Sequence, residues 1–361
     1  MTSKHLILLG THDNYIHSAI FDAEACTLTK GKTTPTNPHP SWLTRHPKHK
    51  DIIYANGHVE GKVFAYKLID DQGGLALLGQ ASTGGRGPTH LAVLEDGSEI
   101  FMAHYNSGNI SVLPLNEQGL FTLSEPTPEL IYSPPYSALK HHRQEAPHVH
   151  QIIVHRDEII APDLGSNKVW RLKKGFELFG EVSGLEDGDG PRHAVVHPNG
   201  THIYVLNEIS SQLTVHTLPP EGGPSELIKR FSMLPASDNG SPRETGGAEI
   251  VLLPSIRPDG PLMLIASNRD SPSSDTDTLA LFAVSGTDGA EVERTKEGWY
   301  AGIGRHLRGV SGDDQGARYV AVLGRDHGGL KVFERVGEDG LQLKEVAKLE
   351  DIEKAVVPLW I

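Results

Sequence analysis

The chain has 361 residues and a formal net charge of −13, from 46 acidic and 33 basic side chains. On average this charge repels a nucleic-acid backbone or an anionic membrane surface, so neither is an expected partner. The 39 glycines and 24 prolines make the sequence rich in turns, which argues against a helical bundle and indicates a globular protein of many short strands.

The only cysteine is Cys26, which excludes an intrachain disulfide and a thiolate metal cluster. We therefore expect a cytoplasmic protein. At the start of the chain, the apolar run Leu6–Leu9 ends at Gly10 and is too short for a secretory signal or a membrane span. We expect His5–Leu9 to form a strand.

One pattern recurs along the rest of the chain. A short apolar strand follows a polar residue, then come a turn, a second apolar strand that ends on a polar residue, a loop, and a third strand. The clearest copy joins Arg192–Gly200, Ile203–Glu208 and Leu213–Thr217. Six copies, 43 to 60 residues apart, begin at Ser41, Thr89, Val149, Arg192, Ala248 and Arg305. Repeats of this length indicate a propeller or an array.

A seventh copy is incomplete, because Leu6–Leu9 and Ser18–Phe21 supply a middle and an outer strand without an inner one. The C-terminal segment Ala355–Ile361 could fill that place and remove the open sheet edges. The sequence thus predicts an all-β, seven-bladed β-propeller whose N- and C-terminal strands share a blade.

No Pro/Ser-rich linker divides the copies, so we expect a single domain over residues 1–361. Three long polar stretches are predicted to be loops between strands: 125–145, 219–226 and 269–277.

Inner strands line the channel of a propeller, so first-strand starts and second-strand ends should gather at the channel ends. The strand-start column holds Trp42, His90, His150, His193, Glu249 and His306. The strand-end column holds Asn56, Asn106, Asp163, Asn207, Asn268 and Arg325.

Polar residues at strand ends are often turn formers, and this structural interpretation suits Asn56, Asn106 and Asp163. It suits Arg192, Glu208 and Arg269 less well, since other copies mostly hold uncharged residues there. Charge confined to a few neighbouring blades indicates a site.

Four residues are catalytic candidates. Arg192 and Arg269 could hold an anion and a developing oxyanion. His150 and Glu208 could move a proton or activate water, and the sequence leaves open which of them is the base. Six neighbours are substrate-binding candidates: His90, His193, Asn207, Glu249, Asn268 and His306.

A metal site is a weaker alternative. His148 and His150 occupy alternate positions of a predicted strand and could share a zinc ion, with Asp163 or His193 as a third ligand. Neither of these is close to the pair in the sequence, so no third ligand is obvious, and we expect neither a metal nor another cofactor. It contains no phosphate-binding P-loop, dinucleotide fingerprint or G-x-S-x-G elbow.

Several motifs resemble the propeller family of 6-phosphogluconolactonases and carboxy-cis,cis-muconate cyclases. The most specific are Gly190–Val195, Tyr204–Glu208 and Ala266–Arg269, and the likeness spans nearly the whole chain. The resemblance implies a metal-free site at the channel mouth that opens or closes a lactone ring. By motif, the functional set of the muconate cyclases falls on His150, Arg192, Glu208 and Arg269.

Two directions of chemistry remain open. The motifs Asp163–Gly165 and Tyr204–Glu208 look more like those of the sugar lactonases, so hydrolysis of a sugar-acid lactone is favoured over closure of muconate. The segments Asp270–Asp277 and Gly304–His306 depart from the family wording, which leaves the size and charge of the substrate open.

A partner-binding scaffold without activity is the alternative from another class. The four tryptophans mostly lie in or beside predicted strands rather than on loops, which favours a pocket for a small lactone or organic acid. Protein partners stay unassigned.

Overall fold

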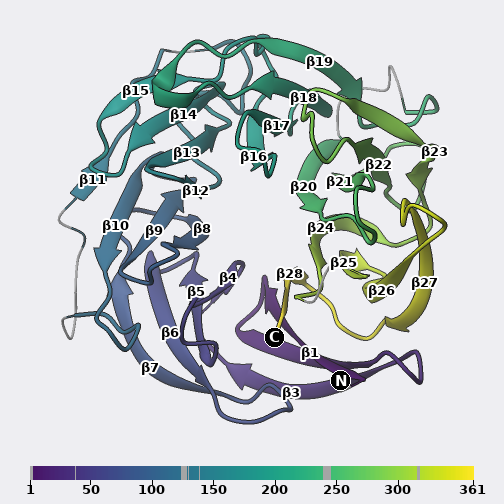
Figure 1. Ribbon diagram of the computed structural model, residues 1–361. Coiled ribbons are helices and arrows are strands. Elements are labelled where there is room, and N and C mark those ends of the chain that lie inside the picture. Colours follow the sequence, from purple (N-terminus) through teal and green to yellow (C-terminus); the bar gives the residue numbers. More distant parts are fainter. Residues whose placement is uncertain are drawn as a thin grey trace.

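Seven four-stranded antiparallel sheets form a ring of blades in the computed structural model (Figure 1). The structure describes residues 3–36, 38–122, 128, 130–137, 139–238, 245–314 and 318–361. The predicted seven-bladed propeller is therefore confirmed. Within the described residues the helical content is one 3₁₀ turn, η1 (Pro220–Gly222), and no helix is long and apolar enough to cross a membrane.

The blades are numbered along the chain, and the strands of each are given from the channel outward. Blade 1 has β28 (Ala355–Trp360), β1 (Lys4–Thr11), β2 (Tyr15–Asp22) and β3 (Thr27–Pro35), and blade 2 has β4 (Leu43–Arg45), β5 (Ile52–Gly57), β6 (Lys62–Leu68) and β7 (Leu75–Ser82). Blade 3 has β8 (Pro88–Val93), β9 (Glu99–His104), β10 (Ile110–Pro114) and β11 (Leu130–Tyr132), and blade 4 has β12 (Ile153–His155), β13 (Glu158–Asp163), β14 (Lys168–Lys173) and β15 (Leu178–Glu181). Blade 5 has β16 (Pro191–Val196), β17 (His202–Asn207), β18 (Gln212–Thr217) and β19 (Leu227–Ser232). Blade 6 has β20 (Gly246–Leu253), β21 (Leu262–Arg269), β22 (Leu279–Val284) and β23 (Val292–Tyr300), and blade 7 has β24 (Arg305–Gly312), β25 (Tyr319–His327), β26 (Gly329–Val336) and β27 (Gln342–Leu349).

Ring closure follows the prediction from the sequence. The C-terminal strand β28 pairs antiparallel with β1 in blade 1, with Ile7 opposite Trp360 and Leu8 opposite Leu359. Both ends of the chain are thus held in one sheet, which closes the ring and leaves no unpaired edge along the channel side of β1.

Each blade has a fourth, outer strand that the three-strand pattern did not predict. The second strands read as apolar runs because both of their faces are buried, as in β21, where every residue is buried. The outer strands are half exposed and polar: β3 has a single buried residue, Leu28. Their sequences therefore lack the apolar signal by which strands are recognised.

Two further boundaries were predicted wrongly. In blade 4 the inner strand is β12 at residues 153–155 rather than 149–153, and only an isolated bridge pairs Val149 with Asp163. The polar stretch 125–145 contains the short strand β11 and is not wholly a loop, and its residues 125–127, 129 and 138 lie outside the described part.

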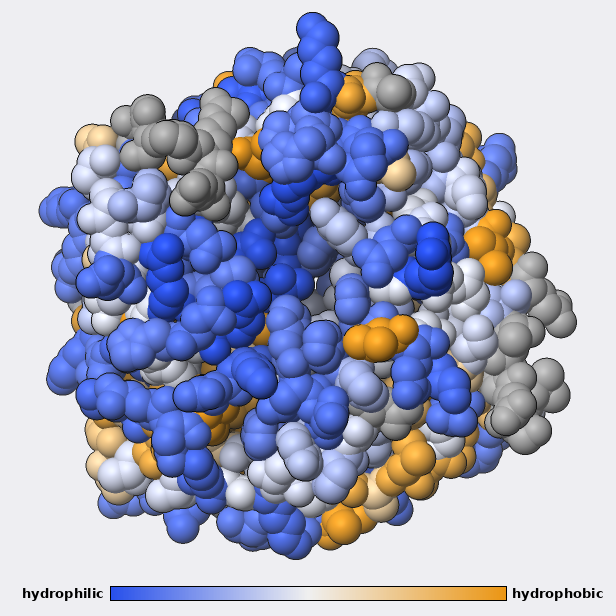
Figure 2. Space-filling view, turned by 180° about the vertical axis from the view of Figure 1, so that it is seen from behind, coloured by the Kyte–Doolittle hydropathy of each residue, from blue (hydrophilic) through white to orange (hydrophobic). Residues whose placement is uncertain are grey.

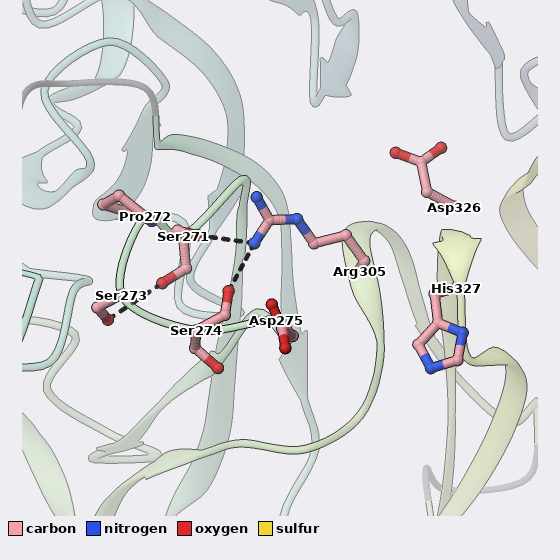
Figure 3. Close-up of a pocket in the computed structure, with 8 residues that line it drawn as sticks. All are labelled: Ser271, Pro272, Ser273, Ser274, Asp275, Arg305, Asp326 and His327. Atoms are coloured by element: carbon pink, nitrogen blue, oxygen red, sulfur yellow. Dashed lines mark hydrogen bonds between the residues drawn. The ribbon is translucent and has the colours of Figure 1, made fainter.

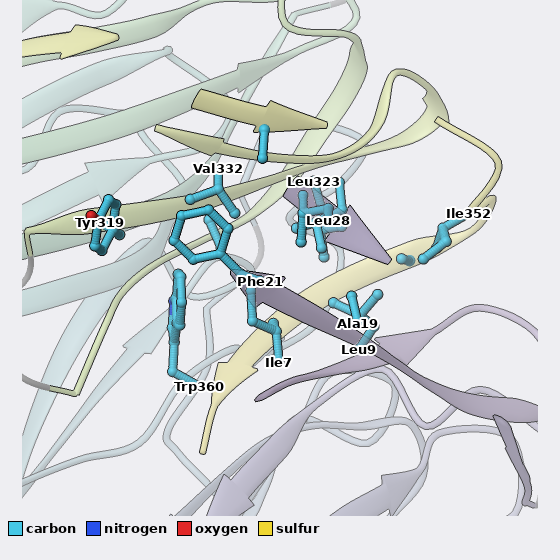
Figure 4. Close-up of a cluster of buried hydrophobic side chains, with 14 residues drawn as sticks. Ile7, Leu9, Ala19, Phe21, Leu28, Tyr319, Leu323, Val332, Ile352 and Trp360 are labelled. Carbon is cyan, nitrogen blue, oxygen red and sulfur yellow. The ribbon is translucent and has the colours of Figure 1, made fainter. Parts of the chain in front are cut away.

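Apolar side chains pack between neighbouring blades. At the seam between blades 7 and 1, the rings of Phe21, Trp360 and Tyr319 lie together in one such cluster (Figure 4). The Phe21 and Tyr319 rings lie 4.9 Å apart, edge to face. Because each blade packs on two neighbours, the ring fixes the polar residues at the channel mouth without relying on them for its core.

Candidate active site

Glu208 directly follows β17, at the end of the channel where β16 begins. Its backbone N–H donates to Gly190 O over 2.7 Å. Gly190 has a φ of +65°, which glycine adopts without strain, and a Cβ there would lie 2.7 Å from the Ile209 side chain. The Gly-Pro-Arg turn therefore brings Arg192 beside Glu208.

Three guanidinium groups contact the Glu208 carboxylate, and we call them the arginine cluster. Arg192 Nε lies 3.0 Å from Oε2, and Arg269 Nη2 lies 2.8 Å from Oε1. Arg143 Nη2 also donates to Oε1. The side chains of Glu208 and Arg192 are 4% and 3% exposed, whereas that of Arg143, which comes from the segment before β12, is 37% exposed.

Backbone carbonyls of blade 6 hold the two buried guanidinium groups. Arg192 Nη1 donates to Ala248 O, and Arg269 Nη2 donates to Gly247 O over 3.1 Å. Donors that are fixed before substrate arrives can stabilise a developing negative charge without reorganising.

The three arginines of the cluster keep Glu208 ionised. Burial opposes its ionisation, but Arg269, Arg192 and Arg143 outweigh burial and hold the pKa of the Glu208 carboxyl well below its usual range. At neutral pH Glu208 is therefore a carboxylate with little tendency to accept a proton.

Arg308, on the inner strand β24, adds a further cation. Among the described residues its guanidinium has neither a hydrogen-bond nor an ion-pair partner, and burial together with Arg192 and Arg269 lowers its pKa well below the usual value. The mouth thus holds more positive than negative charge, which favours an anionic ligand although the whole chain is acidic.

A buried chain of hydrogen bonds begins at His150. His150 Nδ1 lies 3.1 Å from His193 Nε2, and His193 Nδ1 lies 2.7 Å from Glu249 Oε1. Burial, reinforced by the charge of Arg192, lowers the pKa of both imidazoles well below the usual value. Burial also raises the pKa of the Glu249 carboxyl to about 7, against the opposing effect of Arg192.

Next to the hydrogen-bonded residues His150, His193 and Glu249 lies a cavity of about 720 Å³, lined by inner-strand residues of all seven blades. Trp42, His90 and Glu249 line the end of this cavity that is nearer the arginine cluster. Each of them comes before the aliphatic residues of its inner strand. The Trp42 and His90 rings are 4.1 Å apart, and the His90 and His193 rings 5.8 Å. In the view from the face opposite to that in Figure 1, hydrophilic side chains surround a central hollow (Figure 2).

Asn207 and Asn268 do not join this group. Asn207 Nδ2 donates to Thr214 Oγ1 over 3.1 Å, and Asn268 Nδ2 donates to Met233 O over 2.7 Å. Both side chains are almost wholly buried, at 0% and 1% exposure. Their contacts tie strands together, in agreement with the structural interpretation of the strand-end column.

A separate pocket of about 880 Å³ is lined by the segment 271–275 together with Arg305, Asp326 and His327 (Figure 3), and His306 directly follows Arg305 in the chain. One wall of the pocket is the segment 271–275, and Arg305 Nη1 holds it by donating to Ser271 O over 2.7 Å and Ser274 O over 2.8 Å. His306 Nδ1 lies 3.2 Å from Asp270 Oδ1. The two segments that depart from the family wording thus meet in one wall.

The geometry disfavours the zinc pair suggested by His148 and His150. His148 Nδ1 contacts Tyr105 O at 2.7 Å, while His150 Nδ1 contacts His193. Within the described ranges, one group has ligand atoms close enough to hold a cation, namely Asp270, His306 and Asp326. Arg325 already binds Asp326 through two contacts of 2.6 and 2.8 Å.

The predicted catalytic residues His150, Arg192, Glu208 and Arg269 all lie at this mouth, the last three in direct contact. Sequence reasoning missed Arg143 and Arg308. Arg308 stands two positions after His306 in an inner strand, and this alternation could have revealed it. Arg143 lies outside the repeat, so no local pattern predicts where its side chain goes.

Comparison with known proteins gives a consistent family match. Residues 6–359 match the family model described as lactonase, 7-bladed beta-propeller. The chain is 27% identical over 352 residues to a 6-phosphogluconolactonase of Bacillus subtilis (strain 168), which covers 94% of this chain and 93% of the relative. It is 29% identical over 299 residues to a 6-phosphogluconolactonase of Klebsiella pneumoniae (strain ATCC 700721 / MGH 78578), which covers 81% and 80%.

A solved structure has the same fold. The periplasmic gluconolactonase of Pseudomonas aeruginosa superposes with a TM-score of 0.81 at 23% identity, covering 99% of both chains. At this identity the likeness establishes the fold alone.

Proposed function

The chain belongs to the lactonase family of seven-bladed β-propellers. From this premise we propose that it hydrolyses a sugar-acid lactone at the channel mouth that holds the arginine cluster. The substrate we favour is 6-phosphogluconolactone or a related aldonolactone, in line with the names of the relatives. The observation that carries the proposal is the cluster of Arg143, Arg192 and Arg269 on Glu208, close to His150.

Electrostatics favour an anionic substrate. A phosphate or carboxylate group would find several guanidinium donors and an excess of positive charge in a narrow space. Arg308, which has no partner among the described residues, is the natural contact for a phosphate. The surplus charge would also concentrate such substrates at the mouth.

In the proposed mechanism, Arg192 and Arg269 polarise the lactone carbonyl and stabilise the oxyanion that forms when water attacks. Glu208 holds these guanidinium groups in place. His150 is the base that activates water, because its imidazole is neutral at working pH and can accept a proton. Glu208 forms ion pairs with three arginines, which oppose its protonation.

The direct test follows acid release by purified protein at neutral pH, with spontaneous hydrolysis subtracted. The substrates are 6-phosphogluconolactone, unphosphorylated gluconolactone and carboxymuconolactone, each with and without a chelator. We expect turnover of the phosphorylated lactone that the chelator does not change. No turnover of either sugar lactone would overturn the proposal, and conversion of carboxymuconolactone alone would favour the cyclase direction.

Arg192→Lys is expected to lower kcat/KM by roughly 10- to 100-fold, because Lys cannot reproduce the planar pair of contacts that Arg makes. Arg171→Lys is a matched control: Arg171 is fully buried against Glu158, in blade 4. It should lower the melting temperature and leave kcat/KM unchanged. Full activity of Arg192→Lys would contradict its role.

Arg308→Met is expected to raise KM for 6-phosphogluconolactone about tenfold, the loss of one charge-assisted hydrogen bond. KM for unphosphorylated gluconolactone should change little. The melting temperature should rise, because the variant removes a partly buried cation that Arg192 and Arg269 repel. Arg318→Met, which removes an exposed charge, is the control. Equal KM changes for both lactones would show that Arg308 does not bind the phosphate group.

A further inference from the structure

We propose that His193 and Glu249 are positioning residues that hold His150 in the tautomer of a base and receive the proton it accepts. The three residues would form a proton relay leading away from the arginine mouth. This role rests on the lactone hydrolysis proposed above. It assigns proton transfer to His193 and Glu249 in place of direct substrate binding.

The chain of contacts is continuous. His150, His193 and Glu249 come from blades 4, 5 and 6, and the two links measure 3.1 and 2.7 Å. The His193 and Glu249 side chains are 1% and 8% exposed. Three neighbouring blades thus bring one polar residue each into a line that water scarcely reaches.

The direction of each hydrogen bond follows from the ionised state of Glu249. An ionised carboxylate can only accept, and Glu249 Oε1 accepts from the amide of Ile250 over 3.0 Å and from His193 over 2.7 Å. His193 Nδ1 then carries the hydrogen of the 2.7 Å contact, which leaves Nε2 of a neutral His193 as an acceptor. His150 Nδ1 donates to it, and His150 Nε2 keeps a lone pair.

The electrostatic surroundings disfavour a stable imidazolium in this chain. Arg192 on β16 and Arg308 on β24 face the relay, and both disfavour positive charge on His193. The charged or titratable groups that face Glu249 are Arg192, His193 and Arg308. A carboxylate among these cations can accept a proton and become neutral, which avoids a new buried charge.

The proposed step is balanced. As water attacks the lactone carbonyl, a C–O bond forms, the carbonyl π pair moves to the oxygen, and the water proton passes to His150 Nε2. The Nδ1 proton of His150 passes to His193 Nε2, and the Nδ1 proton of His193 passes to the Glu249 carboxylate. When the ring C–O bond breaks, the released alkoxide takes a proton back along the same path.

Glu249 also reaches the far side of the layer. Glu249 is among the residues that line the 720 Å³ cavity, together with Trp42 and His90. The relay therefore connects the reacting mouth with a compartment that substrate need not enter.

Glu249→Gln separates proton uptake from positioning. The Gln Oε1 can still accept from Ile250 and His193, so the tautomers are kept, but the amide cannot take a proton. In the parent, kcat/KM should rise with pH through about 7 as Glu249 ionises, and then level off. The variant should lose this rise and show a kcat roughly tenfold lower.

Glu145→Gln is the matched control, because Glu145 Oε1 contacts a histidine at the same mouth, His148 Nε2, over 3.2 Å. Its pH profile should match that of the parent. If Glu249→Gln also kept the parent profile while the lactone was still hydrolysed, the relay would be overturned and the lactonase function would stand.

Nitrogen-15 NMR of the imidazoles in the substrate-free protein gives a readout that does not depend on turnover. We expect hydrogen on Nδ1 of both His150 and His193, in Glu249→Gln and, at a pH above about 7 where Glu249 is ionised, in the parent. Hydrogen on His150 Nε2 would overturn the relay. The expected tautomers in a protein that hydrolyses no lactone would support the chain and reject the proposed function.

Discussion

Glu208→Gln is expected to lower kcat/KM by roughly 10³-fold and to destabilise the protein by about 3–5 kcal/mol, the usual cost of removing one partner from a buried ion pair. The Glu208 carboxylate is shared by Arg143, Arg192 and Arg269. Without its charge these guanidinium groups repel one another and leave the positions needed for an oxyanion. Thermal unfolding and lactone kinetics measure the two effects.

Two further measurements make this prediction specific. Inorganic phosphate should raise the melting temperature of the variant more than that of the parent, because an anion can replace the lost carboxylate. The pKa of Glu208 lies below its ordinary value of 4.5 in the folded protein, so the parent should lose this stabilisation as pH falls below about 4.5. The variant should lack that acid dependence.

Glu158→Gln provides the control for stability. It breaks another buried ion pair, with Arg171 Nε at 2.9 Å, on strands that do not line the channel. It should destabilise the protein while kcat/KM stays at the parent value. Comparable kinetic losses in both variants would mean that Glu208 acts only through stability.

The fold was predictable from the sequence where burial is symmetrical. Strands such as β17 and β21 are enclosed by neighbouring blades on both faces, so selection for packing leaves an uninterrupted apolar run. Outer strands such as β3 face water and owe their conformation to pairing with β2, which no local pattern encodes. The shift of β12 has another cause: residues 148–150 meet the end of β13 only in the isolated bridge of Val149 and Asp163, where the Asp163 side chain also accepts the backbone N–H of His148.

The site was predictable where function breaks the repeat. Arg192, Glu208 and Arg269 stand at repeat positions that do not require charge, and the three are in contact. Asn207 and Asn268 stand one position before Glu208 and Arg269, yet their amides bond to neighbouring strands, because a repeat position alone does not give the direction of a side chain. The third partner of Glu208, Arg143, could be found only from the path of the chain outside the repeat.

His150→Asn is expected to lower kcat by roughly 10²- to 10⁴-fold with little change in KM, the range for loss of a positioned base. The Asn amide can still donate to His193 Nε2, so the contact that measures 3.1 Å in the parent is retained. What the variant loses is the Nε2 lone pair. The effect should therefore appear in kcat rather than in substrate binding or the melting temperature.

His197→Asn tests whether replacing a buried histidine away from the channel mouth would give the same result. His197 follows the far end of β16, is 1% exposed, and bonds to Ser285 O through Nε2 over 2.9 Å. Its replacement should cost stability and leave kcat unchanged. If His150→Asn turned over within threefold of the parent, water would have to be activated by a group other than His150. Glu208 could take that part only if its pKa rose in the complex, because three guanidinium groups favour its ionised form in the free protein.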